Sequence, residues 1–344
     1  MTELNDEVET VSHGLELQAA ILHLLDGRHH NIVLSEQTLD LEDPQIAKYV
    51  RRYITRCKND MRAKPGTFAE ESEFARQLER YFHHESDLPG FTGTVCEPLA
   101  KYFEHEEARS FAVLAVDYRV DDVPYLAFIL LEEVDTMTCI TDSVNGRILN
   151  TVNFGTLSLP PFSRPITSFA VINQITGEIL FVDQTKWNDG ISVITDHLLD
   201  AEAGISRKEV VEHVKNIACE VAEEFHENPT ILLSKVKNYI SDTVKEGMPL
   251  STESLAETVF DDTPRMAQAF REKAEEKTLP KVVELPKAPI VTAMKKQRIS
   301  TDTGIEVSFP AEYFQNNQFI EFVNHPDGTI SIEIKQISKI TNKL

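Results

Sequence analysis

Apolar runs of strand length recur between residues 110 and 183, and turn-forming residues separate them. The runs cover residues 111–116, 125–134, 137–141, 147–152, 166–172 and 178–182. Asn145-Gly146 and Thr176-Gly177 lie between runs, and their glycines supply the backbone freedom that a tight reversal requires. The pattern predicts one antiparallel sheet made from these six runs. Pro160-Pro161-Phe162 interrupts it, and marks either an edge of the sheet or an excursion from it.

Before this region the spacing of apolar residues changes to a helical period. Residues 15–25 are apolar and fit a strand or a short helix equally well. Asp43-Pro44 supplies a helix N-cap followed by the proline favoured at the first helical position. We expect a helix from there to Pro65-Gly66, a second over residues 68–84, a loop over 88–93 and a short helix over 95–103.

After the predicted sheet the helical period returns. Ser206 and Glu209 form a capping box that opens a helix ending at Asn228-Pro229. Further helices are predicted over residues 230–245, 251–260 and 264–277. Prolines then punctuate an extended connection into residues 291–300, and strands over 304–309, 319–323 and 329–334 predict a second, small meander.

These elements predict an α+β fold in three regions. Residues 1–188 form an N-terminal domain with a central antiparallel sheet and flanking helices, residues 189–278 a helical region, and residues 279–344 a small β-rich domain. An alternative division joins the last two regions into one unit.

Composition narrows the class of protein. The 344-residue chain is 41% hydrophobic, so it can bury real cores. No run approaches the roughly 18 apolar residues that a membrane span needs, and the acidic start does not resemble a secretory leader. The four cysteines form no CxxC pair, which argues against a zinc ribbon or a disulfide framework. We expect a cytoplasmic protein without membrane contact, cofactor or bound metal.

The net charge of −22 repels nucleic acid on average and favours basic proteins as partners. One segment reverses this sign. At about 100° per residue, the helix after Pro44 places apolar side chains on one arc, and these are Ile46, Val50, Tyr53, Ile54, Cys57 and Met61. Cations occupy the opposite arc and the residues just beyond, and these are Lys48, Arg51, Arg52, Arg56, Lys58, Arg62 and Lys64.

Such a cationic face predicts weak, sequence-independent binding of double-stranded DNA through its phosphates. The alternative interpretation is an ordinary solvated helix face, neutralised by the acidic N-terminal segment folding across it.

Motifs for catalysis are largely missing from the sequence. Phosphate-binding loops, HExxH, GxSxG and EF-hand spacings do not occur. Asp327, Glu333 and Lys335 match the letters of the PD…ExK motif of metal-dependent nucleases. However, Asp327 falls in a predicted turn and Glu333 lies six residues along the same strand, roughly 20 Å away when extended. A hairpin turn followed by a polar strand explains these residues more simply.

Both ends of the chain resemble a known family. At the N-terminal end the resemblance rests on Ile21-Leu22-His23-Leu24-Leu25-Asp26, Val33-Leu34-Ser35-Glu36 and Leu39-Asp40-Leu41. At the C-terminal end it rests on residues 301–307, 320–322 and 327–340. The chain resembles the bacterial nucleoid-associated proteins of the NdpA type, in particular members from Gram-positive bacteria. The resemblance implies a chromosome-associated protein of the cytoplasm without a known catalytic set. We interpret His23, the histidine inside the N-terminal signature, as a satisfied core histidine.

Two functional hypotheses follow. In the first, the chain is a non-enzymatic nucleoid-associated protein that binds double-stranded DNA through the helix after Pro44. In the second, it is an acidic adaptor that reaches the chromosome through a basic DNA-handling enzyme. A metal-dependent nuclease is a third and weaker hypothesis. Exposed sheet edges also favour a symmetric homodimer.

Overall fold

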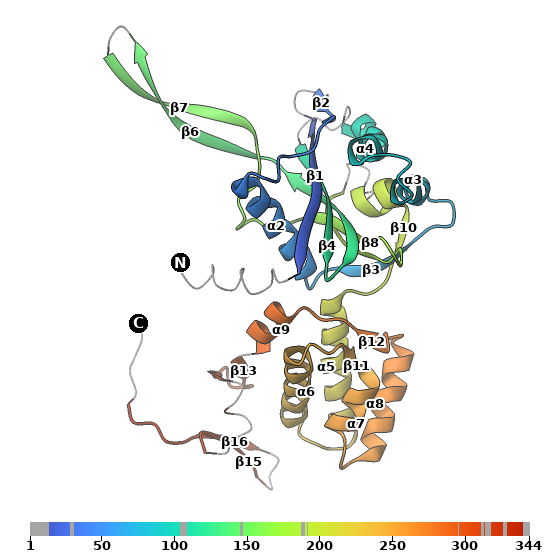
Figure 1. Cartoon of the computed structure of the whole chain (residues 1–344). Coiled ribbons are helices and arrows are strands. Elements are labelled where there is room, and N and C mark those ends of the chain that lie inside the picture. The colour runs from blue at the N-terminus through green and yellow to red at the C-terminus, as the bar shows by residue number, and fades with distance from the viewer. Residues whose placement is uncertain are drawn as a thin grey trace. The chain divides into compact units, whose positions relative to one another are not determined.

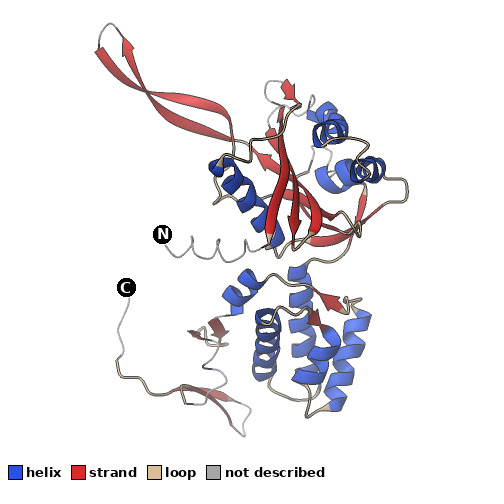
Figure 2. Cartoon of the chain, in the orientation of Figure 1, coloured by secondary structure: helices blue, strands red, loops and turns tan. Residues whose placement is uncertain are grey.

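The computed structural model describes residues 14–27, 31–103, 109–144, 147–186, 190, 192–294, 296–310, 313, 318–325 and 329–339. The chain divides into two compact units, Met1–Ser206 and Arg207–Leu344. The predicted α+β class is confirmed, with a large antiparallel sheet in the first unit and small sheets near the C-terminus (Figure 2). The division into three regions stays a prediction.

The first unit is built on an eight-stranded antiparallel sheet with the strand order β10-β3-β9-β8-β5-β4-β1-β2 (Figure 1). Its strands are β1 (Leu15–Asp26), β2 (Asn31–Val33), β3 (Lys64–Phe68), β4 (Ser110–Val120), β5 (Val123–Glu132), β8 (Ser168–Asn173), β9 (Ile179–Asp183) and β10 (Ala201–Ala203). The ambiguous stretch at residues 15–25 is therefore a strand, and it pairs with β4.

The prediction of a single sheet from six runs was wrong for two of them. β6 (Val134–Val144) and β7 (Arg147–Ser158) pair with each other and form a separate two-stranded hairpin. The reason lies in composition: β4 and β5 are apolar on both faces and mostly buried, whereas in β6 and β7 threonine and asparagine recur between the apolar residues. Only the former pattern suits the middle of a sheet that is covered on both sides.

Helices cover both faces of the sheet. On one face lies α2 (Pro44–Lys58). The other face is covered by α3 (Glu73–Phe82), α4 (Leu88–Phe103) and the π-helix η1 (Val193–Leu199). Alternating residues of β4 and β5 supply both cores, so that Leu114 and Ile129 pack on the α2 side while Val113 and Phe128 pack on the α3 side.

Three predicted boundaries near these helices were wrong. The helix after Pro44 ends at Lys58, and residues 64–68 form β3. The next helix begins only at Glu73, because the Ser72 side chain accepts a hydrogen bond from the Ala75 N–H and caps it. Residues 88–93 are helical rather than a loop, since Asp87 caps the Gly90 N–H and Phe91 is buried in the core.

The second unit contains the predicted helices α5 (Arg207–Glu224), α6 (Pro229–Lys245), α7 (Thr252–Val259) and α8 (Pro264–Glu276). The prediction of an extended connection after α8 was wrong in part, because residues Lys287–Met294 form helix α9. The first turn of α9 accommodates Pro289. Two-stranded sheets complete the unit: β11 (Leu250–Ser251) with β12 (Val282–Val283), β13 (Lys296–Ser300) with β14 (Glu306–Pro310), and β15 (Ile320–Asn324) with β16 (Ile330–Ile334). The C-terminal strands thus form separate hairpins, where the sequence predicted one meander.

Candidate nucleic-acid interface

Helix α2 is fixed at its start by local sequence and along its length by the sheet. The Asp43 carboxylate accepts a hydrogen bond of 2.8 Å from the Gln45 N–H, and Pro44 occupies the first turn. Val50, Tyr53, Ile54 and Cys57 are buried against the sheet, as predicted. Burial of each large side chain contributes about 1.5–3 kcal/mol, so the helix cannot rotate without exposing its core side.

The outward face of α2 carries three cations that we call the outer triad: Lys48, Arg51 and Arg52. Lys48 and Arg52 are exposed and Arg51 is partly buried. The guanidinium carbon of Arg52 lies 4.0 Å from the centroid of the Phe162 ring. This cation–π contact orients Arg52 but leaves its charge unneutralised. Among the described residues, no carboxylate forms an ion pair with any member of the triad.

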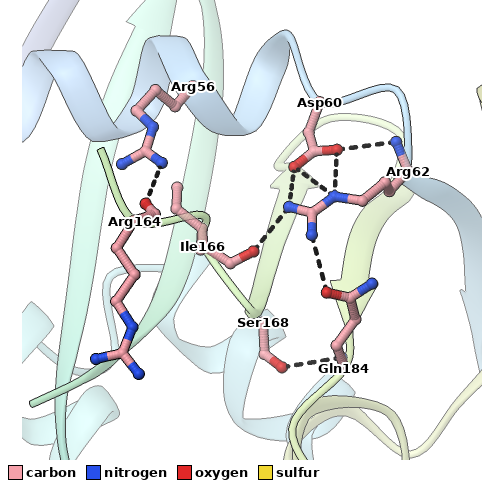
Figure 3. Close-up of polar contacts among 7 residues, drawn as sticks. All are labelled: Arg56, Asp60, Arg62, Arg164, Ile166, Ser168 and Gln184. Carbon is pink, nitrogen blue, oxygen red and sulfur yellow. Dashed lines mark hydrogen bonds and ion pairs between the residues drawn. The ribbon is translucent and has the colours of Figure 1, made fainter. Parts of the chain in front are cut away.

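Arg56 lies at the edge of the same helix and has a structural contact. Its Nη2 donates a hydrogen bond of 2.6 Å to the backbone carbonyl of Arg164 (Figure 3). Nearby, the Tyr53 hydroxyl donates to the Pro160 carbonyl at 3.2 Å, and the Phe162 ring contacts the Tyr53 ring in a tilted arrangement, with 5.0 Å between the ring centroids. The interruption at Pro160-Pro161-Phe162 is therefore an excursion of the chain, which packs on α2.

Arg62, another of the predicted DNA-binding residues, is held by several contacts. Its guanidinium forms an ion pair with Asp60 at 2.6 Å and donates hydrogen bonds of 2.8 Å to the Gln184 side chain and the Ile166 carbonyl (Figure 3). The hydrogen bonds that Arg62 donates to the Asp60 carboxylate are the main cause of a raised pKa for Arg62. These contacts tie the chain after α2 to the start of β8 and the end of β9.

The seven predicted cations therefore do not form one helical ridge. Arg62 and Lys64 lie beyond the end of α2, which corrects their placement on the helix. Lys58, in the last turn, and Lys64, at the start of β3, are both partly buried and have interaction partners. The acidic segment that the alternative interpretation folds across the helix falls largely on residues 1–13, which lie outside the described residues. DNA contact by these cations stays a prediction.

His23, inside the N-terminal signature, is fully buried in β1. Its Nδ1 accepts a hydrogen bond of 3.0 Å from the Ser35 N–H, so Nε2 carries the proton and donates to the Thr92 hydroxyl at 2.9 Å. Burial lowers the pKa of His23 to about 4. The expectation of a core histidine is confirmed. Through His23, a residue of the N-terminal signature, β1 is hydrogen-bonded to the chain at Ser35.

The acidic motif at the C-terminal end is only partly described. Asp327 lies outside the described residues, whereas Lys335 forms ion pairs with Glu321 and, at 3.8 Å, with Glu333. No group of three or more metal-ligating side chains is found in the part of the chain that the structure describes.

Taken together, the fold and the site define a mixed α+β protein that presents a short cationic surface on an acidic chain. The family model described as nucleoid-associated protein YejK matches residues 21–342, and the chain belongs to this family. The match begins at Ile21, the first residue of the N-terminal signature. No curated protein matches the chain.

Family membership supports a location at the nucleoid in the bacterial cytoplasm, as the sequence predicted, and the family is generally non-enzymatic. Among the described residues, no helix is both long and apolar enough to cross a membrane.

Proposed function

We propose that the chain is a non-enzymatic nucleoid-associated protein that binds double-stranded DNA weakly and without sequence preference through the outer triad. The observation that carries this proposal is the environment of Lys48, Arg51 and Arg52. They project from a helix whose other side is locked in the core, and no described carboxylate pairs with them. Arginine and lysine in this setting can each approach a phosphate and release its counterions.

The acidity of the chain sets the strength of this contact. Interactions between exposed charges are largely screened beyond about 8 Å at physiological ionic strength, so a local triad can act on an acidic molecule. The remaining surface still repels phosphate, because the net charge is −22. The contact is therefore weak and requires low or moderate salt.

The test is titration of a fluorescent 30-base-pair duplex with the full chain in about 50 mM salt. A Lys48→Glu/Arg51→Glu/Arg52→Glu variant should lose binding and keep its thermal stability, since none of these side chains is in the core. Arg76→Glu/Arg80→Glu/Arg119→Glu is the control. It makes the same change in total charge at exposed positions on α3 and β4 and should keep binding. Equal loss in both variants, or in neither, contradicts the proposal.

A second candidate function, the adaptor, is favoured by a groove in the second unit. The groove holds about 840 Å³ between α6 and the end of α7, and its acidic lining residues are Asp242, Glu246, Asp261 and Asp262. Ile231 and Met248 expose apolar surface to it. Ser234 also lines it, and its buried hydroxyl has no hydrogen-bond partner among the described residues. An amphipathic basic segment of a DNA-handling protein fits this combination of apolar and acidic surface.

A synthetic amphipathic peptide rich in lysine and leucine tests the groove. It should bind the full chain, and Asp261→Lys/Asp262→Lys should weaken binding at least tenfold. Glu275→Lys/Glu276→Lys is the matched control, because these exposed acids lie at the end of α8 and do not line the groove. Equal weakening by both pairs would show that only the overall charge matters. Recruitment to DNA by a basic enzyme, without DNA binding by the chain alone, would favour the adaptor over direct contact.

A further inference from the structure

The β6–β7 hairpin, which we call the arm, is not part of the eight-stranded sheet of the first unit. Ten register pairs join β6 to β7, and neither strand pairs with any other described strand. Figure 1 shows the arm extending away from the eight-stranded sheet. A two-stranded hairpin alone in water is at best marginally stable. The arm therefore needs a partner surface to be well ordered.

One face of the arm carries exposed apolar side chains. Cys139 pairs with Val152, and Ser143 pairs with Ile148, so Met137, Cys139, Ile148 and Val152 share a face by strand alternation. The exposed fractions are 69% for Met137, 79% for Ile148 and 53% for Val152, and Cys139 is exposed as well. Apolar residues gathered on one exposed face are typical of an interaction surface.

The arm also lacks the charges that normally protect an exposed strand edge. Residues 134–158 contain two acids and one base, while the whole chain contains 56 acids and 34 bases. Residues 136–141 and 148–158 contain no charged side chain and no proline. Isolated edge strands usually carry lysine, proline or inward charges, because these prevent pairing with another chain. The centre of the arm has none of these.

We propose that the arm is a dimerisation element, in which the apolar face of one arm packs against the same face of the arm of a second copy of this chain. The charge of the chain favours a second copy as the partner of the arm. Two copies with a net charge of −22 repel each other on average, and an almost uncharged element lets them approach with the least repulsion. Packing of identical faces about a twofold axis is self-complementary, which is the usual geometry of a homodimer.

Sedimentation of the full chain at micromolar concentration tests this proposal. The wild-type chain should sediment as a dimer of the 38.9 kDa protomer. Met137→Lys/Ile148→Lys/Val152→Lys should sediment as a monomer with an unchanged circular dichroism spectrum, because all three side chains are exposed. Ile175→Lys/Ile305→Lys/Ile337→Lys is the control, since it adds the same charge at exposed apolar positions off the arm and should stay dimeric.

Cys139 gives an independent readout, because it lies midway along β6 on the proposed contact face. A short bifunctional maleimide should link two wild-type chains. The link should be lost in Cys139→Ser and kept in Cys219→Ser, while Cys57 and Cys96 are buried and unreactive in the native state. A wild-type chain that sediments as a monomer overturns the proposal. A dimer that survives the arm substitutions and cannot be linked through Cys139 overturns it equally.

Discussion

At the scale of single residues, the structure separates cations that look alike in the sequence. Arg51 and Arg62 both fall on the predicted cationic arc and both are partly buried, yet Arg62 is bound to three partners and Arg51 has no ion pair to a described carboxylate. Gln184 and Ile166 lie more than a hundred residues further along the chain. A helical wheel contains no information about such distant partners, so sequence could predict the charge of the arc but not which charges are available.

Arg62 should therefore matter for stability rather than for DNA contact. We expect Arg62→Gln to lower the free energy of unfolding by about 1–3 kcal/mol, because charge-assisted hydrogen bonds are lost and Asp60 loses its partner. Arg62→Lys should restore little, since an ammonium cannot reproduce the planar fork that reaches Asp60, Gln184 and Ile166 together. Urea unfolding measures the effect, with Arg51→Gln as control. Equal, small effects of Arg62→Gln and Arg51→Gln would contradict a stabilising role for the contacts of Arg62.

His23 predicts a pH dependence of stability. Its pKa is lowered to about 4 in the folded chain by burial, against about 6.5 in the unfolded chain, so only the unfolded state binds the proton between these values. Stability from this group is complete well above pH 6.5 and is lost as the pH falls through 6.5 towards 4, by about 3 kcal/mol in total. Urea unfolding between pH 7 and pH 4 should show a shallower slope for His23→Gln than for the wild-type chain. The exposed His83, replaced by glutamine, is the control.

At the scale of elements, the helix cap at Asp43 was predicted correctly, whereas several helix boundaries and the pairing of distant strands were not. Asp43-Pro44 starts a helix where the sequence placed it, because caps act within one turn. The helix predicted from residue 230 begins at Pro229, where Asn228 is the cap. The runs in the arm have strand period too, and their strand character was correct. Their membership of the large sheet was not, since period alone does not say which strand lies next to which.

Substitution of the N-cap residue Asp43 tests how much the cap of α2 contributes to stability. Asp43→Ala should destabilise the chain by about 1 kcal/mol, because the Gln45 N–H loses its acceptor. Asp43→Asn should cost less, since an amide oxygen can accept the same hydrogen bond. Thermal unfolding measures both. A larger loss in Asp43→Asn than in Asp43→Ala would show that charge at the helix start, and not the cap, is what matters.

At the scale of the whole molecule, strong overall acidity and local DNA contact can coexist only if the contact is small. The fold class followed from the alternation of strand and helix periods, but the site depends on which cations the folded chain leaves open. A dimer formed through the arm would carry two outer triads. The second triad then binds at a high effective concentration, which strengthens a weak contact without any new interface.

The central claim is that specific side chains of α2 meet phosphates, and the salt dependence of DNA binding tests it most directly. For each chain engaged on the duplex, three phosphate contacts predict that log K falls with log salt concentration with a slope of about −2.7. Replacement of Lys48, Arg51 or Arg52 singly by glutamine should make this slope shallower by about 0.9, whereas Arg119→Gln should leave it unchanged. Slopes that are the same for the wild-type chain and for all four variants would contradict the account.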